Sequence, residues 1–220
     1  MKRLVLFAKE PVAGRVKTRL AKEIGDDAAL RLYTAFLSDL AAEMPADEWE
    51  TVLAAAEEPI GPQLAATFAG GWGFTLQGEG SLGDRLSRTF RAAFEDGLEA
   101  CAVAGSDAPT LNRGVAREAF AALSKGADVV FAPAPDGGYS LVGLASVVDP
   151  ERVFHDVRWS TCHALADTRA ASEKEGYSVA LLPELLDVDE SSDLAALRNA
   201  LDGDPRLCPA TRGALAEVVR

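Results

Sequence analysis

The sequence contains little cysteine and little histidine. Its 220 residues include three cysteines, Cys101, Cys162 and Cys208, and two histidines, His155 and His163. The cysteines are far apart and form no C-x-x-C pair, which excludes a disulfide framework and argues against a structural zinc site. We expect all three cysteines to be small buried residues in a reducing compartment, and both histidines to be structural.

Long apolar runs are also missing. The N-terminal run stops at Lys9, Glu10 and Pro11, so it is too short for a signal peptide or a membrane span. We therefore expect a cytoplasmic protein without a membrane span.

Positive charge is scarce but concentrated. Lys and Arg number 22 against 34 Asp and Glu, which gives a net charge of −12. A surface this acidic excludes general binding to nucleic-acid polymers or anionic lipid. Residues 1–22, however, hold seven of the cations and a single anion, so a local basic site is expected near the N-terminus.

Segments typical of strands and helices alternate along the chain. We expect strands at 3–8, 50–56, 74–77, 100–104, 129–132, 139–144, 179–182 and 186–189. We expect helices at 26–44, 63–68, 86–94, 113–123, 161–175, 194–201 and 211–219. This alternation, without a linker or repeat, predicts a single Rossmann-like α/β domain over residues 1–220, with three αβα layers and a mostly parallel central sheet. Ligands of such sheets bind beyond the carboxyl ends of the strands.

A basic loop follows the first strand. It contains Lys9, Gly14, Lys17 and Arg19, a combination in which backbone N–H groups and cations can bind phosphate. The P-loop pattern and G-x-G-x-x-G are both absent. The alternative is a solvated basic turn.

Carboxylates follow two later strands. Asp107 comes directly after the strand at 100–104, where it could hold Mg²⁺ or cap a turn. A strand at 186–189 would place Asp187 and Asp189 on one face. Asp189 is the better metal candidate, with Asp187 behind it, whereas Asp193 is expected to be structural in the first turn of a helix.

Ser191 or Ser192 is expected to cap that helix.

A glycine-rich turn lies between these segments. Asp136, Gly137 and Gly138 could offer open backbone amides and a carboxylate to a substrate, or they could form a hairpin turn. Tyr139 and Trp159 flank this turn in the sequence, and flanking aromatic residues usually belong to the core.

Taken in order, these motifs resemble one bacterial family. The matching segments are F-A-K at 7–9, K-T-R-L-A at 17–21, G-S-D-A-P-T-L at 105–111, P-D-G-G-Y-S-L-V-G-L at 135–144 and V-R-W-S-T at 157–161. Over residues 2–201 the chain resembles the glycosyltransferase-like family of the nucleotide-diphospho-sugar transferases, which has the glycosyltransferase A fold. K-T-R-L-A is also similar to phospholactate guanylyltransferases. The ending at 188–194 is similar to that of cytidylyltransferases, whose corresponding Asp binds Mg²⁺.

The resemblance implies a set of site residues. It implies phosphate contacts at Gly14, Lys17 and Arg19, and we add Lys9 and Thr18 from the same loop. Lys17 and Arg19 are also expected to be catalytic.

The resemblance further implies that Asp107, a catalytic candidate, binds Mg²⁺ (or Mn²⁺) together with Asp189. It implies acceptor or sugar contacts around Asp136, Gly137 and Gly138. We add the neighbouring aromatic residues Tyr139 and Trp159.

The implied activity is that of a metal-dependent transferase acting on a nucleotide or nucleotide sugar and a small-molecule acceptor. Glycosyl transfer is the first interpretation. Most metal-dependent glycosyltransferases of this fold carry D-x-D, but Gly105 stands at the first position here. A lone Asp107 paired with the distant Asp189 is closer to the pattern of nucleotidyltransferases, which release pyrophosphate. A non-catalytic nucleotide-binding module is the second alternative. The sequence does not predict an oligomeric state.

Overall fold

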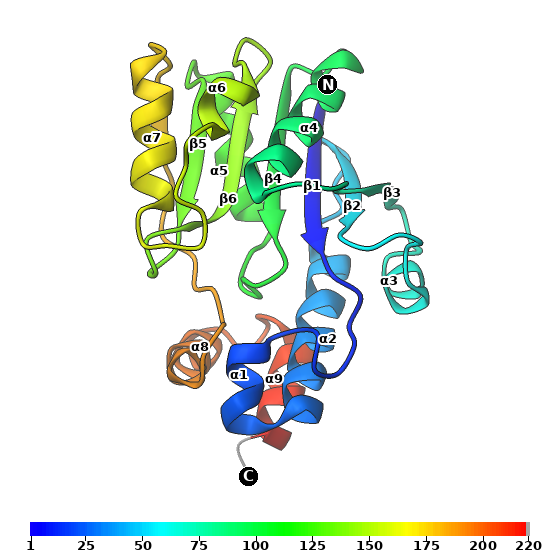
Figure 1. Cartoon of the computed structure of the whole chain (residues 1–220). Helices are drawn as coiled ribbons and strands as arrows, with labels where there is room; N and C mark the ends of the chain where they lie inside the picture. Colours follow the sequence, from blue (N-terminus) through cyan, green and yellow to red (C-terminus); the bar gives the residue numbers. More distant parts are fainter. Residues whose placement is uncertain (219–220) are drawn as a thin grey trace.

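One seven-stranded sheet forms the centre of the computed structural model, which describes residues 1–218 (Figure 1). The strand order is β3-β2-β1-β4-β6-β5-β7. The strands are β1 (Lys2–Ala8), β2 (Glu50–Ala55), β3 (Gly73–Leu76), β4 (Ala100–Gly105), β5 (Val129–Pro133), β6 (Tyr139–Ala145) and β7 (Val179–Leu181). All pairs are parallel except those of β6 with β4 and β5. The predicted mostly parallel sheet is confirmed.

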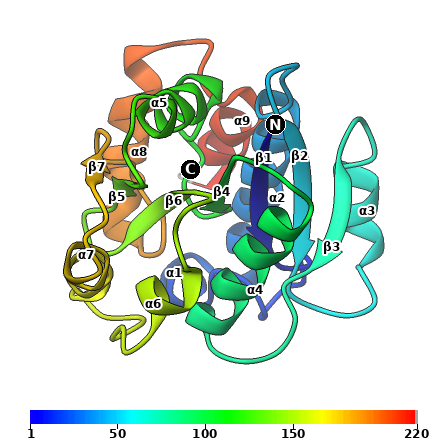
Figure 2. The same cartoon turned by 90° about the horizontal axis from the view of Figure 1, so that it is seen from above.

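Helices cover both faces of this sheet, as expected for an α/β fold. The described helices are α1 (Thr18–Ile24), α2 (Asp26–Glu43), α3 (Pro62–Thr67), α4 (Leu82–Glu95), α5 (Arg113–Ser124), α6 (Pro150–Phe154), α7 (Ala164–Lys174), α8 (Ser191–Gly203) and α9 (Pro209–Val218). Seen along the strands, α5 and α9 lie on one side of the sheet, and α4 and α6 on the other (Figure 2). Within residues 1–218, no helix combines the length and the apolar character that crossing a membrane requires.

The alternating side chains of β1 explain the two layers. Leu4, Leu6 and Ala8 belong to the larger apolar cluster, which includes residues of α2, α5, α8 and α9. Val5 belongs to the second cluster under α4 and α6, and Phe7 packs against it. Because side chains of a strand alternate between faces, one short apolar strand supplies both cores.

Two short helices were not predicted. α1 lies in and beyond the segment predicted as a loop at 9–19, and it spans only seven residues before Gly25 ends it. α6 spans five residues behind Asp149, whose side chain caps it. Helices this short carry little periodic sequence, and packing stabilises them.

Several predicted helix ends also differ, two of them as follows. The helix predicted at 161–175 begins at Ala164, because Thr161 accepts a hydrogen bond from His163 N and donates one to Arg158 O in a preceding turn. The last helix was predicted to reach Val219, which lies outside the described residues.

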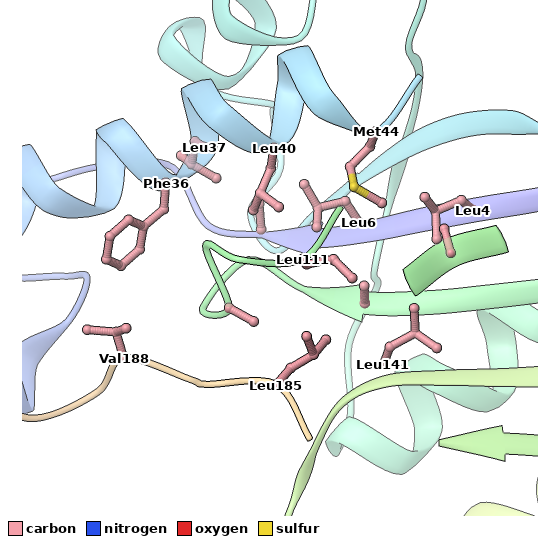
Figure 3. Packing of buried hydrophobic residues seen from close by; sticks show 14 of the residues in the cluster. Leu4, Leu6, Phe36, Leu37, Leu40, Met44, Leu111, Leu141, Leu185 and Val188 are labelled. Carbon is pink, nitrogen blue, oxygen red and sulfur yellow. The ribbon is translucent and has the colours of Figure 1, made fainter. Parts of the chain in front are cut away.

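The predicted strand at 186–189 is wrong. Residues 182–189 belong to no strand; the chain there is tied by single backbone bonds, such as Val188 N to Asp107 O at 3.0 Å. The Val188 side chain is buried and lies near Phe36 of α2 (Figure 3). The segment is therefore held by its apolar side chains and by isolated hydrogen bonds.

The cap of α8 also differs from the prediction. The helix begins at Ser191, and Glu190 is its capping residue, with Asp193 completing a capping box. The structural role expected for Asp193 is confirmed. Ser191 and Ser192 are not the cap, because both are already residues of the helix.

Only two of the cysteines are buried. Cys101 and Cys208 lie in the core, and burial raises the pKa of both thiols to about 12. Cys162 is exposed, which corrects the prediction. It lies on the turn that precedes α7, where the chain runs over the surface.

The antiparallel strand β6 has a consequence for the site. Its first residues, Tyr139 and Ser140, precede Leu141, which pairs with Ala104 near the carboxyl end of β4. The beginning of β6 therefore lies at the same edge of the sheet as the ends of β1 and β4. In Figure 1 the helices α1 and α8 lie beyond this edge.

A buried carboxylate fastens the C-terminal helix to this arrangement. Asp39 on α2 is 8% exposed, and its two oxygens accept from Ala210 N at 2.9 Å and Thr211 N at 2.8 Å. These N–H groups belong to the first turn of α9, which has no earlier backbone partner for them. Asp39 thus caps a helix that is 170 residues away in the chain.

We predict that Asp39→Ala lowers the free energy of unfolding by about 2 kcal/mol, because two buried N–H groups lose their acceptors. Urea denaturation measures the loss. Asp47→Ala is the control, since Asp47 is exposed and should change stability by less than about 0.5 kcal/mol. Equal losses in the two variants would contradict the capping role.

Candidate functional site

A cavity of about 590 Å³ opens at the carboxyl ends of β1 and β4. Basic residues of the β1–α1 loop line one side, and the carboxylates of Asp107, Asp187 and Asp189 line another. The apolar part of the lining includes Phe7, Leu82, Leu86, Val103, Tyr139 and Val142. The cavity therefore combines a charged region with an apolar one, as ligand sites commonly do.

One ammonium group joins the charged side chains. Lys17 Nζ forms an ion pair with Asp107 Oδ1 and lies 3.1 Å from Asp189 Oδ1. The lysine side chain is only 2% exposed, whereas those of Asp107 and Asp189 are 48% and 44% exposed. The ammonium also lies 5.8 Å from the centre of the Phe36 ring. Three segments separated by more than 80 residues thus meet at one nitrogen.

The β1–α1 loop is held from two sides. Glu10 accepts from Gln63 N at 2.9 Å and Leu64 N at 3.1 Å at the start of α3. On the other side, the Tyr33 hydroxyl accepts from Lys9 N at 3.0 Å and lies 3.0 Å from Ser106 Oγ. Burial raises the pKa of Tyr33, and the nearby Asp107 carboxylate raises it further. Tyr33 therefore stays a neutral link between the basic loop and the β4 turn.

Backbone hydrogen bonds place the carboxylates next to each other. Val188 N donates to the carbonyl oxygen of Asp107, which fixes the 182–190 segment against the β4 turn. Asp193 Oδ2 then accepts from Asp189 N at 2.9 Å and from Glu190 N at 2.8 Å. Because the side chain of Val188 points into the core, Asp187 and Asp189 on either side of it reach the cavity.

Asp187 is more buried than the other two carboxylates of the cavity, Asp107 and Asp189. Ser140 Oγ donates to Asp187 Oδ1 at 2.6 Å, and Ser140 itself is 3% exposed. Burial raises the pKa of Asp187 to about 6; the charge of Asp107 adds to the rise, and the Ser140 hydrogen bond opposes it. Asp187 is therefore a carboxyl group that titrates close to neutral pH.

Most of the predicted phosphate and metal residues line this cavity. They are Lys9, Lys17, Thr18, Arg19, Asp107 and Asp189. Gly14 is not in the lining; it takes a positive φ of 72° and lies beside Asp26 at the start of α2. Its observed role is to turn the loop.

Only one of the residues predicted to contact the acceptor lines the cavity. Tyr139 lines the cavity, whereas Asp136, Gly137, Gly138 and Trp159 do not. Asp136 accepts from Gly138 N at 2.8 Å inside the β5–β6 hairpin turn. The hairpin alternative is therefore the one observed, and contact of these residues with an acceptor stays a prediction.

Trp159 packs among aromatic rings. Its ring centroid is 6.3 Å from those of both Tyr139 and Phe154, and its Nε1 lies beside Gly83 of α4. A side chain at position 83 would meet both Trp159 and the backbone of Phe154. Trp159 thus supports the wall from which Tyr139 faces the cavity.

Several cavity residues were not singled out from the sequence. They are Arg15, Tyr33, Gln77, Gly80, Arg85, Ser106, Ser140 and Ser160. Arg15 lies within the basic loop, so its charge was a usable signal. Ser140 reaches the cavity because β6 is antiparallel. Tyr33 reaches it because α2 crosses the loop. Neither the strand direction nor the helix crossing can be predicted from a local sequence pattern.

The carboxylate pair fits a hard divalent cation. Asp107 and Asp189 already contact a common cation, the Lys17 ammonium, and both are about half exposed to the cavity. Among residues 1–218, no group of three or more His, Cys, Asp or Glu side chains is arranged for a metal. Two carboxylates with the remaining ligands from water and phosphate oxygens are the usual arrangement for Mg²⁺.

Comparisons with known proteins identify a family and a fold. A family model described as "uncharacterized protein conserved in bacteria (DUF2064)" matches residues 39–161. The match includes Asp107 but not Lys17 or Asp189. No curated protein matches the chain.

Solved structures show the same fold. A protein from Desulfovibrio desulfuricans G20, assigned as a nucleotide-diphospho-sugar transferase, is 25% identical, with a TM-score of 0.88 over 99% of this chain and 97% of its own. A cytidylyltransferase from Leptospira borgpetersenii is 14% identical, with a TM-score of 0.57 over 91% and 86%. A CMP:2-keto-3-deoxy-manno-octonic acid synthetase in complex with CTP is 10% identical, with a TM-score of 0.52 over 92% and 99%. The predicted resemblance to nucleotide-diphospho-sugar transferases and nucleotidyltransferases is confirmed.

The titration of Asp187 predicts a pH effect on stability. The pKa in the folded protein is about 6 against an ordinary value of 3.8, so the folded state binds more protons between these values. Stability must then fall as pH rises through this window. We expect wild type to lose roughly 2 kcal/mol relative to Asp187→Asn between about pH 4.5 and about pH 7.5.

Urea unfolding of both proteins at the two pH values, in EDTA, measures this difference. The Asn side chain keeps an acceptor for Ser140, which makes the variant a fair reference. A difference that does not change with pH would show that Asp187 titrates normally.

Proposed function

We propose that this chain, which belongs to DUF2064, a family conserved in bacteria, is a metal-dependent transferase that uses an activated nucleotide. The observation that carries the proposal is the contact of Lys17 with both Asp107 and Asp189 at the carboxyl ends of the strands. A cationic loop and a carboxylate pair on one cavity suit a phosphorylated donor and its cation.

In this proposal the basic loop binds the phosphates of the donor. Lys9, Arg15, Lys17 and Arg19 line the cavity next to the carboxylates and would neutralise charge on the leaving group. Asp107 and Asp189 would hold Mg²⁺, which, when bound, neutralises phosphate oxygens and orients them. Catalysis would come mainly from positioning and electrostatic stabilisation.

Glycosyl transfer is the first candidate reaction. The similarity to the Desulfovibrio desulfuricans protein, at 25% identity over almost the whole of both chains, supports it. An acceptor atom would bond to the anomeric carbon of a nucleotide sugar. The bond from that carbon to the diphosphate would break, and the nucleoside diphosphate would leave with the electron pair.

Nucleotidyl transfer is the second candidate, and Gly105 favours it. The first position of D-x-D is a glycine, so the cation would rely on two carboxylates from distant segments. An acceptor oxygen would then bond to the α-phosphorus of a nucleoside triphosphate. The bond to the β-phosphate oxygen would break, and pyrophosphate would leave.

We predict that nucleotides stabilise the protein in the presence of Mg²⁺. At a ligand concentration 100 times the dissociation constant, the gain is about 2.7 kcal/mol. A thermal-shift panel of nucleoside triphosphates and nucleotide sugars, with Mg²⁺ and with EDTA, measures it. Asp107→Asn should remove the Mg²⁺-dependent part, because a metal ligand is lost. Asp47→Asn, an exposed change at the opposite end of the sheet, should keep it.

Stabilisation that is the same for the Asp107→Asn and Asp47→Asn variants would argue against the metal role of Asp107. If no nucleotide stabilised the wild-type protein under either condition, the proposed donor class would be wrong.

The released product separates the two reactions. The donors that stabilise the protein are incubated with pooled small-molecule acceptors, and the products are separated by chromatography with mass detection. A free nucleoside diphosphate would support glycosyl transfer, whereas pyrophosphate would support nucleotidyl transfer. In either case we expect Asp107→Asn to lower kcat/KM by about 100-fold or more, because electrostatic stabilisation of the leaving group is lost. Unchanged turnover in this variant would contradict the mechanism.

A further inference from the structure

Lys17 has an unusual place for a residue that is expected to bind phosphate. Its side chain is almost fully buried, and its ammonium contacts two carboxylates. Arg19 of the same segment is 62% exposed and has only a 3.9 Å ion pair with Glu190. Arg19 could therefore meet a phosphate as it stands, whereas Lys17 is already engaged with anions.

The backbone of Lys17 is also unusual. With φ of 48° and ψ of 42° it lies in the left-handed region, and α1 begins directly after it. A residue with a Cβ adopts this conformation at an energetic cost, which the surrounding contacts must offset. No side-chain cap accompanies it. The ion pairs of the ammonium are thus part of what holds the loop in its present form.

The charges around the ammonium favour an exchange of cations. The Asp107 and Asp189 carboxylates share the single Lys17 ammonium, and Asp187 lines the same cavity. Two cations on the same pair of carboxylate oxygens would lie close together and repel each other. A divalent cation binds carboxylate oxygen directly and carries twice the charge, so it is the stronger competitor when it is present.

We infer that Lys17 and the divalent cation compete for Asp107 and Asp189, and that cation binding frees the Lys17 ammonium for the phosphates of the donor. This inference rests on the proposed function, since it assigns both carboxylates to the metal. The cavity offers a place for the freed group, because Lys9, Arg15 and Arg19 line it beside Lys17.

The exchange couples the two ligands. Metal binding would release a cation that phosphate needs, and phosphate would hold that cation away from the carboxylates. Each ligand must then raise the affinity for the other by the same factor, within the usual range of about 5- to 150-fold. Lys17 could instead orient the two carboxylates for the metal. Its removal would then lower the affinity for the metal, whereas competition predicts that removal raises it.

Manganese binding to Lys17→Met tests the inference. We expect the variant to bind Mn²⁺, measured by electron paramagnetic resonance, about tenfold or more tightly than wild type. The Mn²⁺-loaded variant should also bind inorganic pyrophosphate more weakly than the Mn²⁺-loaded wild type. Arg15→Met is the matched control, because it removes an equal charge from the same loop and should change Mn²⁺ affinity by less than about threefold. Unchanged or weaker Mn²⁺ binding by Lys17→Met would overturn the exchange.

A measurement on the wild-type protein does not depend on how that variant folds. An amine-acylating reagent should label the buried Lys17 slowly, and saturating Mg²⁺ should raise the rate at least about fivefold by freeing the ammonium. Mass spectrometry of peptides reads the labelling, with the exposed Lys22 as the internal reference. A Lys17 rate that Mg²⁺ leaves unchanged would contradict the inference.

Failure of the proposed metal site has a different signature. If Mn²⁺ bound the Asp107→Asn and Asp189→Asn variants as tightly as wild type, the carboxylates would not be its ligands. Mn²⁺ could instead bind wild type, fail to bind those two variants, and bind Lys17→Met with the same affinity as wild type. That result would support the metal site and contradict the exchange.

Discussion

The contact of the Lys17 ammonium with Asp107 and Asp189 is the interaction on which the rest of the site depends. It joins the end of the β1–α1 loop, the turn after β4 and the segment before α8, three parts of the chain that no secondary structure links directly. A buried ammonium is tolerated only with such partners, because losing them would leave an uncompensated charge. The same contact gives the cavity both its cationic and its anionic side.

Buried apolar residues around this contact fix the positions of the charged side chains. Val188 is buried against the core, and its N–H bonds to Asp107, so the two neighbouring carboxylates face the cavity. Tyr33 and Glu10 do the same for the basic loop by tying it to Ser106 and to α3. The order of charged groups is therefore set by a few backbone hydrogen bonds between elements that are themselves held by hydrophobic burial.

Much of the fold could be predicted, because its signals are local. The buried strands β1 and β5 are short apolar runs, and α2 shows clear helical spacing. The failures have physical causes as well. α1 and α6 carry little periodic sequence over their seven and five residues. Residues 186–189 were predicted as a strand because polar and apolar residues alternate there, yet they belong to no strand.

The sequence by itself determined which residues carry the chemistry: a basic loop after the first strand and single carboxylates after later segments, because residue type and position after a strand are local facts. Only the tertiary structure decided how they meet. It placed Lys17 between the two carboxylates, brought Ser140 beside Asp187 through an antiparallel strand, and left Asp136 in a hairpin outside the cavity lining. These outcomes depend on strand direction and on contacts across up to 172 residues, which no local pattern encodes.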